Sequence, residues 1–82
     1  MSHYILTRAE LESYHGRNGA PSFVAYRGKV YDVSGSPLWR HGRHQARHSA
    51  GADLTTSLDE APHGAEFLER FPIVGSLAEE SD

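Results

Sequence analysis

The chain has 82 residues and no cysteine, and its eight lysines and arginines against eleven aspartates and glutamates give a formal net charge of −3. This length predicts a single domain over residues 1–82, with its core at about residues 4–77, and the missing cysteines exclude disulfides and cysteine-bound zinc or iron–sulfur clusters. A core this small supplies only about 3–5 kcal/mol, so we expect a bound cofactor or an oligomer to stabilise the fold.

Hydropathy and charge indicate where the protein is located and which partners it can bind. No run of about 18 apolar residues occurs, and the N-terminus, Met1-Ser2-His3-Tyr4, lacks the pattern of a signal peptide, so we expect a cytoplasmic protein without a membrane segment. Residues 40–52 carry three arginines and no acid, whereas residues 53–82 carry eight acids and one base. Because the chain lacks the extended surface of lysines and arginines that nucleic-acid binding needs, we expect no nucleic-acid partner.

The first third of the chain predicts a strand, a helix and a hairpin. Residues 4–6 are a short strand candidate, and the Thr7-x-x-Glu10 spacing of a capping box predicts a helix from about Arg8 to His15, ended by Gly16. Residues 22–27 and 30–33 are rich in β-branched and aromatic residues. They predict a β-hairpin whose two-residue turn is Gly28-Lys29.

The segment after Pro37 favours helices, and no strand is expected there before Phe71. The predicted helices run from Gly42 to Ala50, from Thr55 or Thr56 to the residue before Pro62, and from Gly64 to Arg70, with a short strand at Ile73-Val74. This order of elements predicts an α+β fold with a small sheet floor and the helices gathered on one side of it.

Six histidines stand beside a single lysine, and histidine is the commonest metal ligand among side chains. On a helix, His41, His44 and His48 would share one face and could bind zinc or copper, although solvent-exposed histidines explain the same spacing. Gln45 follows His44, so the His-Glu-x-x-His motif of metalloproteases is absent. His63, between Pro62 and Gly64, lies where two predicted helices meet, a position that suits either a ligand or a helix cap.

Four segments between residues 7 and 75 carry a resemblance to a known family. They are Thr7-Arg8-Ala9-Glu10-Leu11, Tyr26-Arg27-Gly28-Lys29-Val30-Tyr31-Asp32-Val33, Ala50-Gly51-Ala52-Asp53-Leu54-Thr55 and Phe71-Pro72-Ile73-Val74-Gly75. These segments resemble the cytochrome b5-like heme-binding domains, in the short prokaryotic form related to the membrane-associated progesterone receptor group. The resemblance spans residues 4–77 and implies a small domain whose short mixed sheet forms a floor beneath helical hairpins, with a heme crevice between them.

The resemblance also implies iron ligands. The stretch from Ala50 to His63 has the family spacing that ends at an axial histidine, which makes His63 one ligand. The His-Pro-Gly-Gly motif of the classical cytochromes b5 is absent, but Gly42-Arg43-His44 is similar to the Gly-Pro-Tyr of the progesterone-receptor group, with histidine in place of tyrosine. His44 is therefore the expected second ligand, His48 is the runner-up, and His41 follows.

Such a site implies a six-coordinate, non-covalent b-type heme and one-electron transfer. The alternatives are a module that binds heme or a steroid-like ligand without redox turnover, and a non-heme histidine metal site; a catalyst acting alone is not expected. An acidic rim of Asp53, Asp59, Glu60, Glu66 and Glu69 would attract a basic redox partner. The expected heme-contacting residues, each of which could equally be ordinary core, are Leu38, Trp39, Leu54, Leu58, Phe67, Leu68 and Phe71.

Overall fold

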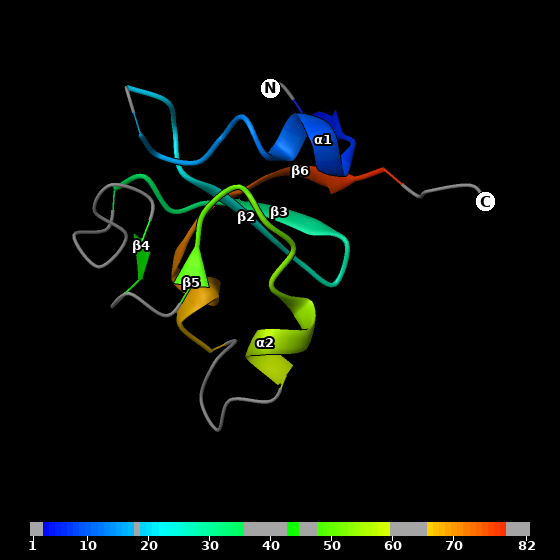
Figure 1. Ribbon diagram of the computed structural model, residues 1–82. Coiled ribbons are helices and arrows are strands. Elements are labelled where there is room, and N and C mark those ends of the chain that lie inside the picture. The colour runs from blue at the N-terminus through cyan, green and yellow to red at the C-terminus, as the bar shows by residue number, and fades with distance from the viewer. Residues whose placement is uncertain (1–2, 18, 36–42, 45–47, 60–65, 79–82) are drawn as a thin grey trace.

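A four-stranded sheet lies at the centre of the fold, with α1 over one face and α2 beyond the other (Figure 1). The computed structural model describes residues 3–17, 19–35, 43–44, 48–59 and 66–78, with the backbone alone at residues 43, 44, 48, 49 and 67. Its elements are β1 (Tyr4–Leu6), α1 (Arg8–Leu11), β2 (Phe23–Tyr26), β3 (Lys29–Asp32), β4 (Arg43–His44), β5 (His48–Ser49), α2 (Thr55–Asp59), the 3₁₀ helix η2 (Glu66–Arg70) and β6 (Ile73–Leu77).

The sheet is mixed, and its strand order is β1-β6-β3-β2. The last strand, β6, lies between the first strand and the hairpin, parallel to β1 and antiparallel to β3. β2 and β3 pair antiparallel. The predicted α+β class and the short mixed sheet are therefore confirmed. The expectation that the helices gather on one side is wrong, because α1 packs on one face of the sheet and α2 and η2 pack on the other.

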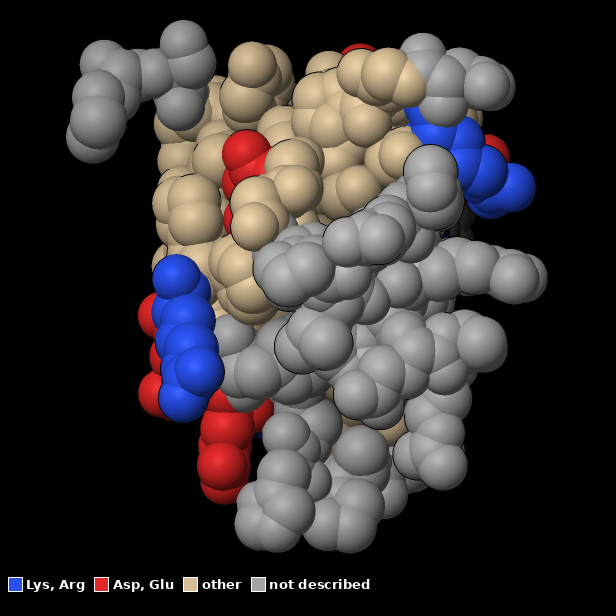
Figure 2. Space-filling view, turned by 90° about the vertical axis from the view of Figure 1, so that its left-hand side faces the viewer, with Lys and Arg blue, Asp and Glu red and all other residues tan. Residues whose placement is uncertain are grey.

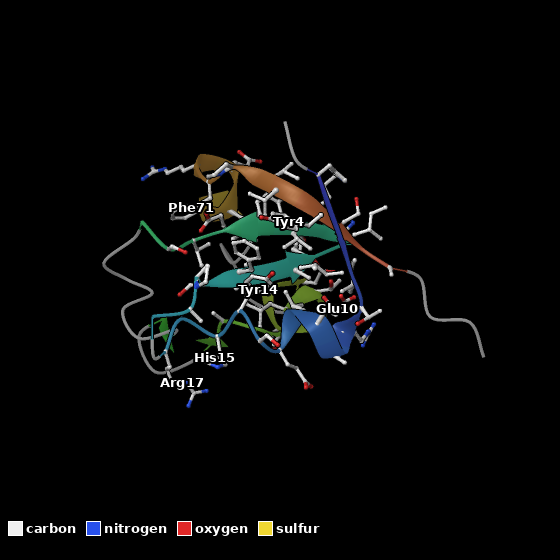
Figure 3. All side chains as sticks on the ribbon, turned by 90° about the horizontal axis from the view of Figure 1, so that it is seen from above. Tyr4, Glu10, Tyr14, His15, Arg17 and Phe71 are labelled. Carbon is white, nitrogen blue, oxygen red and sulfur yellow. The ribbon has the colours of Figure 1, made fainter. Side chains whose placement is uncertain are left out.

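The α1 face of the sheet is covered by a first hydrophobic cluster, here called the α1-side cluster. Tyr14 and Tyr4 lie over this face (Figure 3), and the Tyr14 ring stacks on Phe23 at 4.5 Å between centroids. Because side chains alternate along a strand, Phe23 and Ala25 point to this face. The buried members of the α1-side cluster are Leu6, Leu11, Phe23, Ala25 and Val30.

The opposite face of the sheet is covered by a second cluster, here called the α2-side cluster. It joins Val24 of β2 to residues from three other places along the chain, at position 33, between positions 50 and 58, and at position 68. Its buried members are Val24, Val33, Ala50, Leu54, Leu58 and Leu68. The two clusters thus make the sheet a partition between two small cores.

The first helix is shorter than predicted. The capping box is present, because Thr7 Oγ1 accepts from the Glu10 N–H at 3.0 Å and the Thr7 N–H donates to Glu10 Oε1 at 3.0 Å. The helix ends at Leu11, and the prediction that it reaches His15 is wrong. The reason is tertiary: the Phe23 N–H donates to Tyr14 O at 3.0 Å, so residue 14 pairs with the sheet.

The hairpin is confirmed, but its turn is Arg27-Gly28, one residue earlier than predicted. Tyr26 pairs with Lys29, and Arg27 and Gly28 have φ of 49° and 81°, the signature of a type I′ turn. The register is fixed by burial, because Ala25 and Val30 are partners that both point into the α1-side cluster. A one-residue slip would turn these side chains to the other face.

The helix predicted from Gly42 to Ala50 is wrong. The structure instead has an antiparallel strand pair, β4 with β5, in which Arg43 is opposite Ser49 and His44 is opposite His48. The expectation of no strand before Phe71 fails for the same reason. Residues 40–49 offer a single apolar side chain, Ala46, so they have no apolar stripe that would hold a helix against the core.

The remaining elements match their predictions in place. α2 begins at Thr55, as predicted, and is followed as far as Asp59; residues 60 and 61 lie outside the described part. The helix predicted from Gly64 is seen from Glu66 as the 3₁₀ helix η2, which ends at Arg70. The predicted strand at Ile73-Val74 is β6, which extends to Leu77.

Candidate functional site

Leucines expected beside heme lie in the α2-side cluster. Leu54, Leu58 and Leu68 are only 6%, 2% and 1% exposed, and the half-buried Phe71 packs against the same cluster. In the structure they form the protein's own core, and contact with heme stays a prediction. The other expected pocket residues are Phe67, whose backbone lies in η2, and Leu38 and Trp39, which lie outside the described residues.

The structure places the backbone of His44 in β4 and that of His48 in β5, directly opposite each other. Directly opposite residues of an antiparallel pair have Cα atoms about 4.5–5.5 Å apart. The two candidates for one ligand position are therefore cross-strand neighbours, not residues on successive helical turns. His41 and His63 lie outside the described residues.

Two further histidines, His3 and His15, lie in the N-terminal part of the chain and have polar partners of their own. His3 Nε2 lies 3.0 Å from Ser76 Oγ. His15 Nδ1 accepts a hydrogen bond from the Arg17 N–H at 3.1 Å. Both histidines therefore suit use as control positions.

The α2-side cluster anchors both histidine-bearing segments at both ends. Val33 and Ala50, which are 0% and 5% exposed, precede and follow the segment that carries His41, His44 and His48. Leu58 and Leu68, each five residues from His63, precede and follow the other segment. Segments that are 16 and 9 residues long thus start and finish on one buried apolar surface.

The outer edge of β2 is covered by the chain that leads into α2. The Gly51 N–H donates to Phe23 O at 2.7 Å, the Ala25 N–H to Ala52 O at 3.0 Å, and the Leu54 N–H to Ala25 O at 2.8 Å. Gly51 has φ of 85°, and a Cβ there would lie 3.2 Å from Glu12 O, so both conformation and space favour glycine. The sheet therefore fixes where α2 starts.

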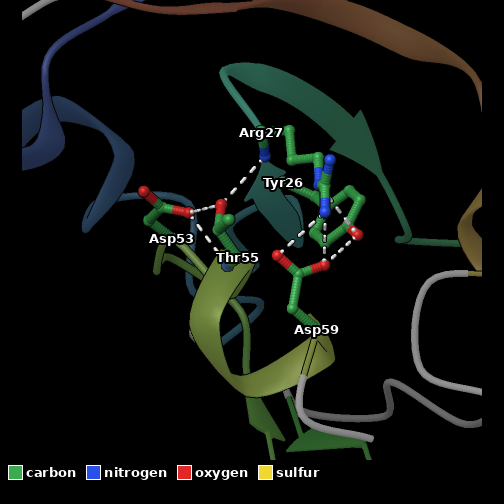
Figure 4. A network of polar contacts seen from close by, with 5 residues as sticks. All are labelled: Tyr26, Arg27, Asp53, Thr55 and Asp59. Atoms are coloured by element: carbon green, nitrogen blue, oxygen red, sulfur yellow. Dashed lines mark hydrogen bonds and ion pairs between the residues drawn. The ribbon is translucent and has the colours of Figure 1, made fainter. Parts of the chain in front are cut away.

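Asp53 caps the start of α2 (Figure 4). Its Oδ1 accepts from the Thr55 N–H at 3.1 Å and from Thr55 Oγ1 at 2.6 Å, while its Oδ2 lies 3.4 Å from Arg8 Nη2. A carboxylate that accepts hydrogen bonds from the N–H groups at the start of a helix stabilises that end. Asp53 thus links α1 to α2 and is held in an ion pair.

The turn residue Arg27 contacts both ends of α2 (Figure 4). Its N–H donates to Thr55 Oγ1 at 2.9 Å, and its Nη2 donates to both carboxylate oxygens of Asp59 at 3.1 Å. Tyr26 Oη donates to Asp59 Oδ1 and accepts from Arg27 Nε at 3.1 Å. The guanidinium also lies 5.5 Å from the centre of the Tyr26 ring.

The contacts among Tyr26, Arg27 and Asp59 shift the pKa of all three side chains. The hydrogen bond from Tyr26 and the nearby Arg27 charge lower the pKa of the Asp59 carboxyl below its usual value. The hydrogen bond to Asp59 raises the pKa of the Tyr26 phenol. The same carboxylate raises the pKa of Arg27. The aspartate is therefore ionised and the phenol protonated across the neutral pH range.

The chain that follows η2, at Phe71 and Pro72, is also attached to the sheet. The Asp32 N–H at the end of β3 donates to Pro72 O at 3.0 Å, and the Phe71 N–H donates to Leu68 O at 2.9 Å. These bonds hold the end of η2 close to the open end of the hairpin. The two ends of the hairpin thus hold the two helices that flank residues 60–65.

Charge is mixed on the face seen in Figure 2, where described Lys or Arg side chains lie beside Asp or Glu side chains at two places. Of the expected acidic rim, Asp53 and Asp59 are paired with Arg8 and Arg27. Within the described residues, no three His, Cys, Asp or Glu side chains gather into a metal site. No helix in that same part of the chain is long and apolar enough to cross a membrane.

Sequence reasoning missed how these polar residues act together. It named Asp53 and Asp59 only as parts of an acidic rim and gave Tyr26, Arg27 and Thr55 no role in the site. The Asp53-x-Thr55 spacing is a usable signal, because aspartate commonly accepts from the backbone two residues on. The Arg27–Asp59 pair has no such signal, because it joins residues 32 positions apart.

Comparisons with known proteins agree with this arrangement. Residues 7–78 match the family model described as the cytochrome b5-like heme/steroid binding domain. A cytochrome b5 domain protein of Hadesarchaea YNP_N21 is 55% identical, with a TM-score of 0.86 over 92% of this chain and 99% of that one. A cytochrome b5 domain protein of Methanococcoides burtonii is 47% identical, with a TM-score of 0.87 over 92% and 97% of the two chains. No curated protein matched.

The family model covers α1, the hairpin, both helices that flank residues 60–65 and β6, and each solved structure covers 92% of the chain. The agreement therefore extends over nearly the whole fold. The chain belongs to the cytochrome b5-like heme/steroid-binding domain family.

Proposed function

We propose that the protein is an electron carrier that binds a b-type heme non-covalently between two histidine-bearing segments. His63, from the segment between α2 and η2, would hold the iron on one side. His44 is the ligand from the other segment, and His48 is its rival. When bound, heme supplies one-electron transfer through the ferric and ferrous states of its iron.

The observation that carries this proposal is the shared anchoring of the two segments. Val33 and Ala50 enclose one, Leu58 and Leu68 enclose the other, and all four side chains are buried in the α2-side cluster. Chains that leave and rejoin one apolar surface can present imidazoles on two sides of an apolar ligand. The membership of the family, whose description names heme, supports the same reading.

The residues present fit heme by their chemistry. The chain supplies six histidines but no cysteine, so thioether attachment is impossible, and ligation and packing must hold the group. The apolar cluster suits the faces of the macrocycle. At about 25 cal/mol per Å², burial of those faces contributes the several kcal/mol that a chain of this size lacks.

Two histidine ligands fix the kind of chemistry. With both bound, the iron would have no open coordination position, which would disfavour oxygen binding and leave electron transfer as the main activity. The excess of acidic residues after residue 52 favours a redox partner with a basic surface. Asp53 and Asp59 are already paired with arginines, which reduces their share in that attraction.

The proposal is tested by titrating the purified chain with hemin and recording optical spectra of both redox states. We expect one equivalent to bind with a sharp low-spin Soret band and split visible bands on reduction. His63→Ala and His44→Ala should lose the low-spin spectrum, whereas His3→Ala and His15→Ala should keep it. Loss in His48→Ala with retention in His44→Ala would assign the ligand to His48.

Other outcomes decide for the alternatives. A chain that binds hemin in a broad high-spin form and is not reduced reversibly would be a ligand-carrying or regulatory module. A chain that ignores hemin but binds zinc or copper through His41, His44 and His48 would be a histidine metal site. Either result would overturn the electron-carrier proposal.

A further inference from the structure

One residue, Arg27, holds both ends of a helix that leads directly to the proposed ligand. Its backbone N–H is bonded to Thr55, the first residue of α2, and its guanidinium is bonded to Asp59, the last. Tyr26, the neighbouring residue, adds its own hydrogen bond to Asp59. Here Tyr26, Arg27 and Asp59 are called the turn clamp.

Arg27 has a backbone conformation that is unusual for a residue with a side chain. With φ of 49°, Arg27 is the only non-glycine residue in the left-handed region among those the structure describes. Glycine and asparagine are preferred in that position of a type I′ turn. A residue held in a sparsely populated conformation persists where the surrounding contacts stabilise it. Within the described residues, the hydrogen bonds of the Arg27 N–H and side chain go to Tyr26 and α2.

The clamp acts where the chain enters the ligand segment. Asp59 precedes His63 by four residues, and Leu58, beside it, is buried in the α2-side cluster. Leu58 fixes how deep the end of α2 lies, whereas the polar contacts of Asp53 and Thr55 lie at the start of the helix. Arg27 Nη2 donates to both carboxylate oxygens of Asp59, and these charge-assisted hydrogen bonds add direction to the contact.

We propose that Arg27 and Asp59 are positioning residues that set the orientation of His63 toward heme by fixing the end of α2 to the hairpin turn. This inference rests on the proposed function, because it assigns the clamp to the heme ligand of that site. Partners that orient a metal ligand typically change metal affinity by about 10- to 100-fold when they are removed.

The test compares Arg27→Gly, Asp59→Asn and the double variant with wild type, all as full-length, hemin-loaded protein. Glycine suits the turn, so Arg27→Gly removes the clamp and keeps the hairpin. Arg17→Gln is the matched control: it removes one arginine charge from an exposed loop residue with no side-chain bond to α2. The readouts are hemin loss to excess apomyoglobin, the midpoint potential, low-spin electron paramagnetic resonance, and thermal unfolding with and without hemin.

The positioning role predicts about tenfold faster hemin loss in both clamp variants, with altered low-spin g values and midpoint potential. The double variant should be no worse than either single variant, because both remove one interaction. A change in unfolding midpoint alone, with loss rate, g values and potential equal to those of Arg17→Gln, would show a merely structural contact and overturn the inference. Wild type that binds no hemin would overturn the proposed function and this inference together.

Discussion

Gly75 of β6 lies against Tyr4 of β1 with no room for a side chain. The two residues are partners in the parallel β1–β6 pair, and a Cβ built on Gly75 would lie 2.2 Å from Tyr4 O and 2.8 Å from Tyr4 C. These are backbone atoms, which cannot rotate away. The close approach of β1 to β6 therefore depends on glycine at this position.

Gly75→Ala should destabilise the protein by about 1–3 kcal/mol, the usual range for inserting a methyl group where there is no space. The strands must separate or shift, and the β1–β6 hydrogen bonds weaken with them. The measurement is urea unfolding followed by circular dichroism.

Gly35→Ala is the control for that variant. A Cβ at Gly35 would meet nothing within 4 Å, so this change should be neutral or slightly stabilising. Equal stability losses in the two variants would show that the contact with Tyr4 is not the cause.

The capping box at α1 gives a second prediction. Thr7→Ala removes the oxygen that accepts from the Glu10 N–H, so we expect a loss of about 0.5–2 kcal/mol in the free energy of unfolding. Thr7→Ser keeps the hydroxyl and should retain most of the wild-type stability. Urea unfolding of the three proteins checks the order, and a serine variant as unstable as the alanine variant would contradict it.

Elements set by local chemistry were predictable from the sequence. The Thr7–Glu10 box and the alternating residues of the hairpin carry their own signals, and both are present as expected. Elements set by tertiary contacts were not. The stacking of Tyr14 on Phe23 ends α1 early, and the turn moved to Arg27-Gly28 because burial of Ala25 and Val30 fixes the register.

In the candidate site, too, features set by local sequence were predictable and features set by tertiary contacts were not. The leucines of the α2-side cluster could be named from their apolar character and their place beside His63, but their burial in the protein's own core could not. The helical spacing of His44 and His48 was misleading, because a polar repeat with no apolar stripe says little about helix formation. The Arg27–Asp59 contact depends on two distant segments meeting, which local sequence does not encode.

The lowered pKa of Asp59 predicts a contribution to stability that depends on pH. Hydrogen bonds from Tyr26 and Arg27 favour the carboxylate in the folded state, so the contribution is full above the unfolded pKa of about 4 and is lost as pH falls through the folded pKa. The unfolding midpoints of wild type and Asp59→Asn should therefore differ at pH 7 and converge below about pH 4. A difference that stays constant to acid pH would argue against this contribution.

Tyr26 makes the opposite prediction at high pH. Its hydrogen bond to Asp59 raises its phenol pKa, so its contribution is full below the unfolded pKa of about 10 and is lost as pH rises through the folded value. An ultraviolet titration should show a late tyrosinate step that disappears in Tyr26→Phe and moves to lower pH in Asp59→Asn. Persistence of that step in Tyr26→Phe would assign it to another tyrosine.

Heme removal should loosen the two sides of the sheet unequally. The α1-side cluster draws its buried residues from β1, α1, β2 and β3 and does not include the four residues that enclose the histidine segments, whereas the α2-side cluster anchors those segments. Without the apolar faces of heme, we expect amide exchange to quicken in α2 and η2 far more than in β2 and β3.

Hydrogen exchange read by mass spectrometry, with and without one equivalent of hemin, measures this difference. Peptides that cover residues 54–59 and 66–70 should lose protection on hemin removal, and peptides that cover residues 23–32 should change little. We expect this difference because the sheet separates the two clusters. The hairpin covers the α1-side cluster whether or not hemin is bound. Equal protection of α2 and η2 in the two states would mean that the α2-side cluster is complete without a ligand.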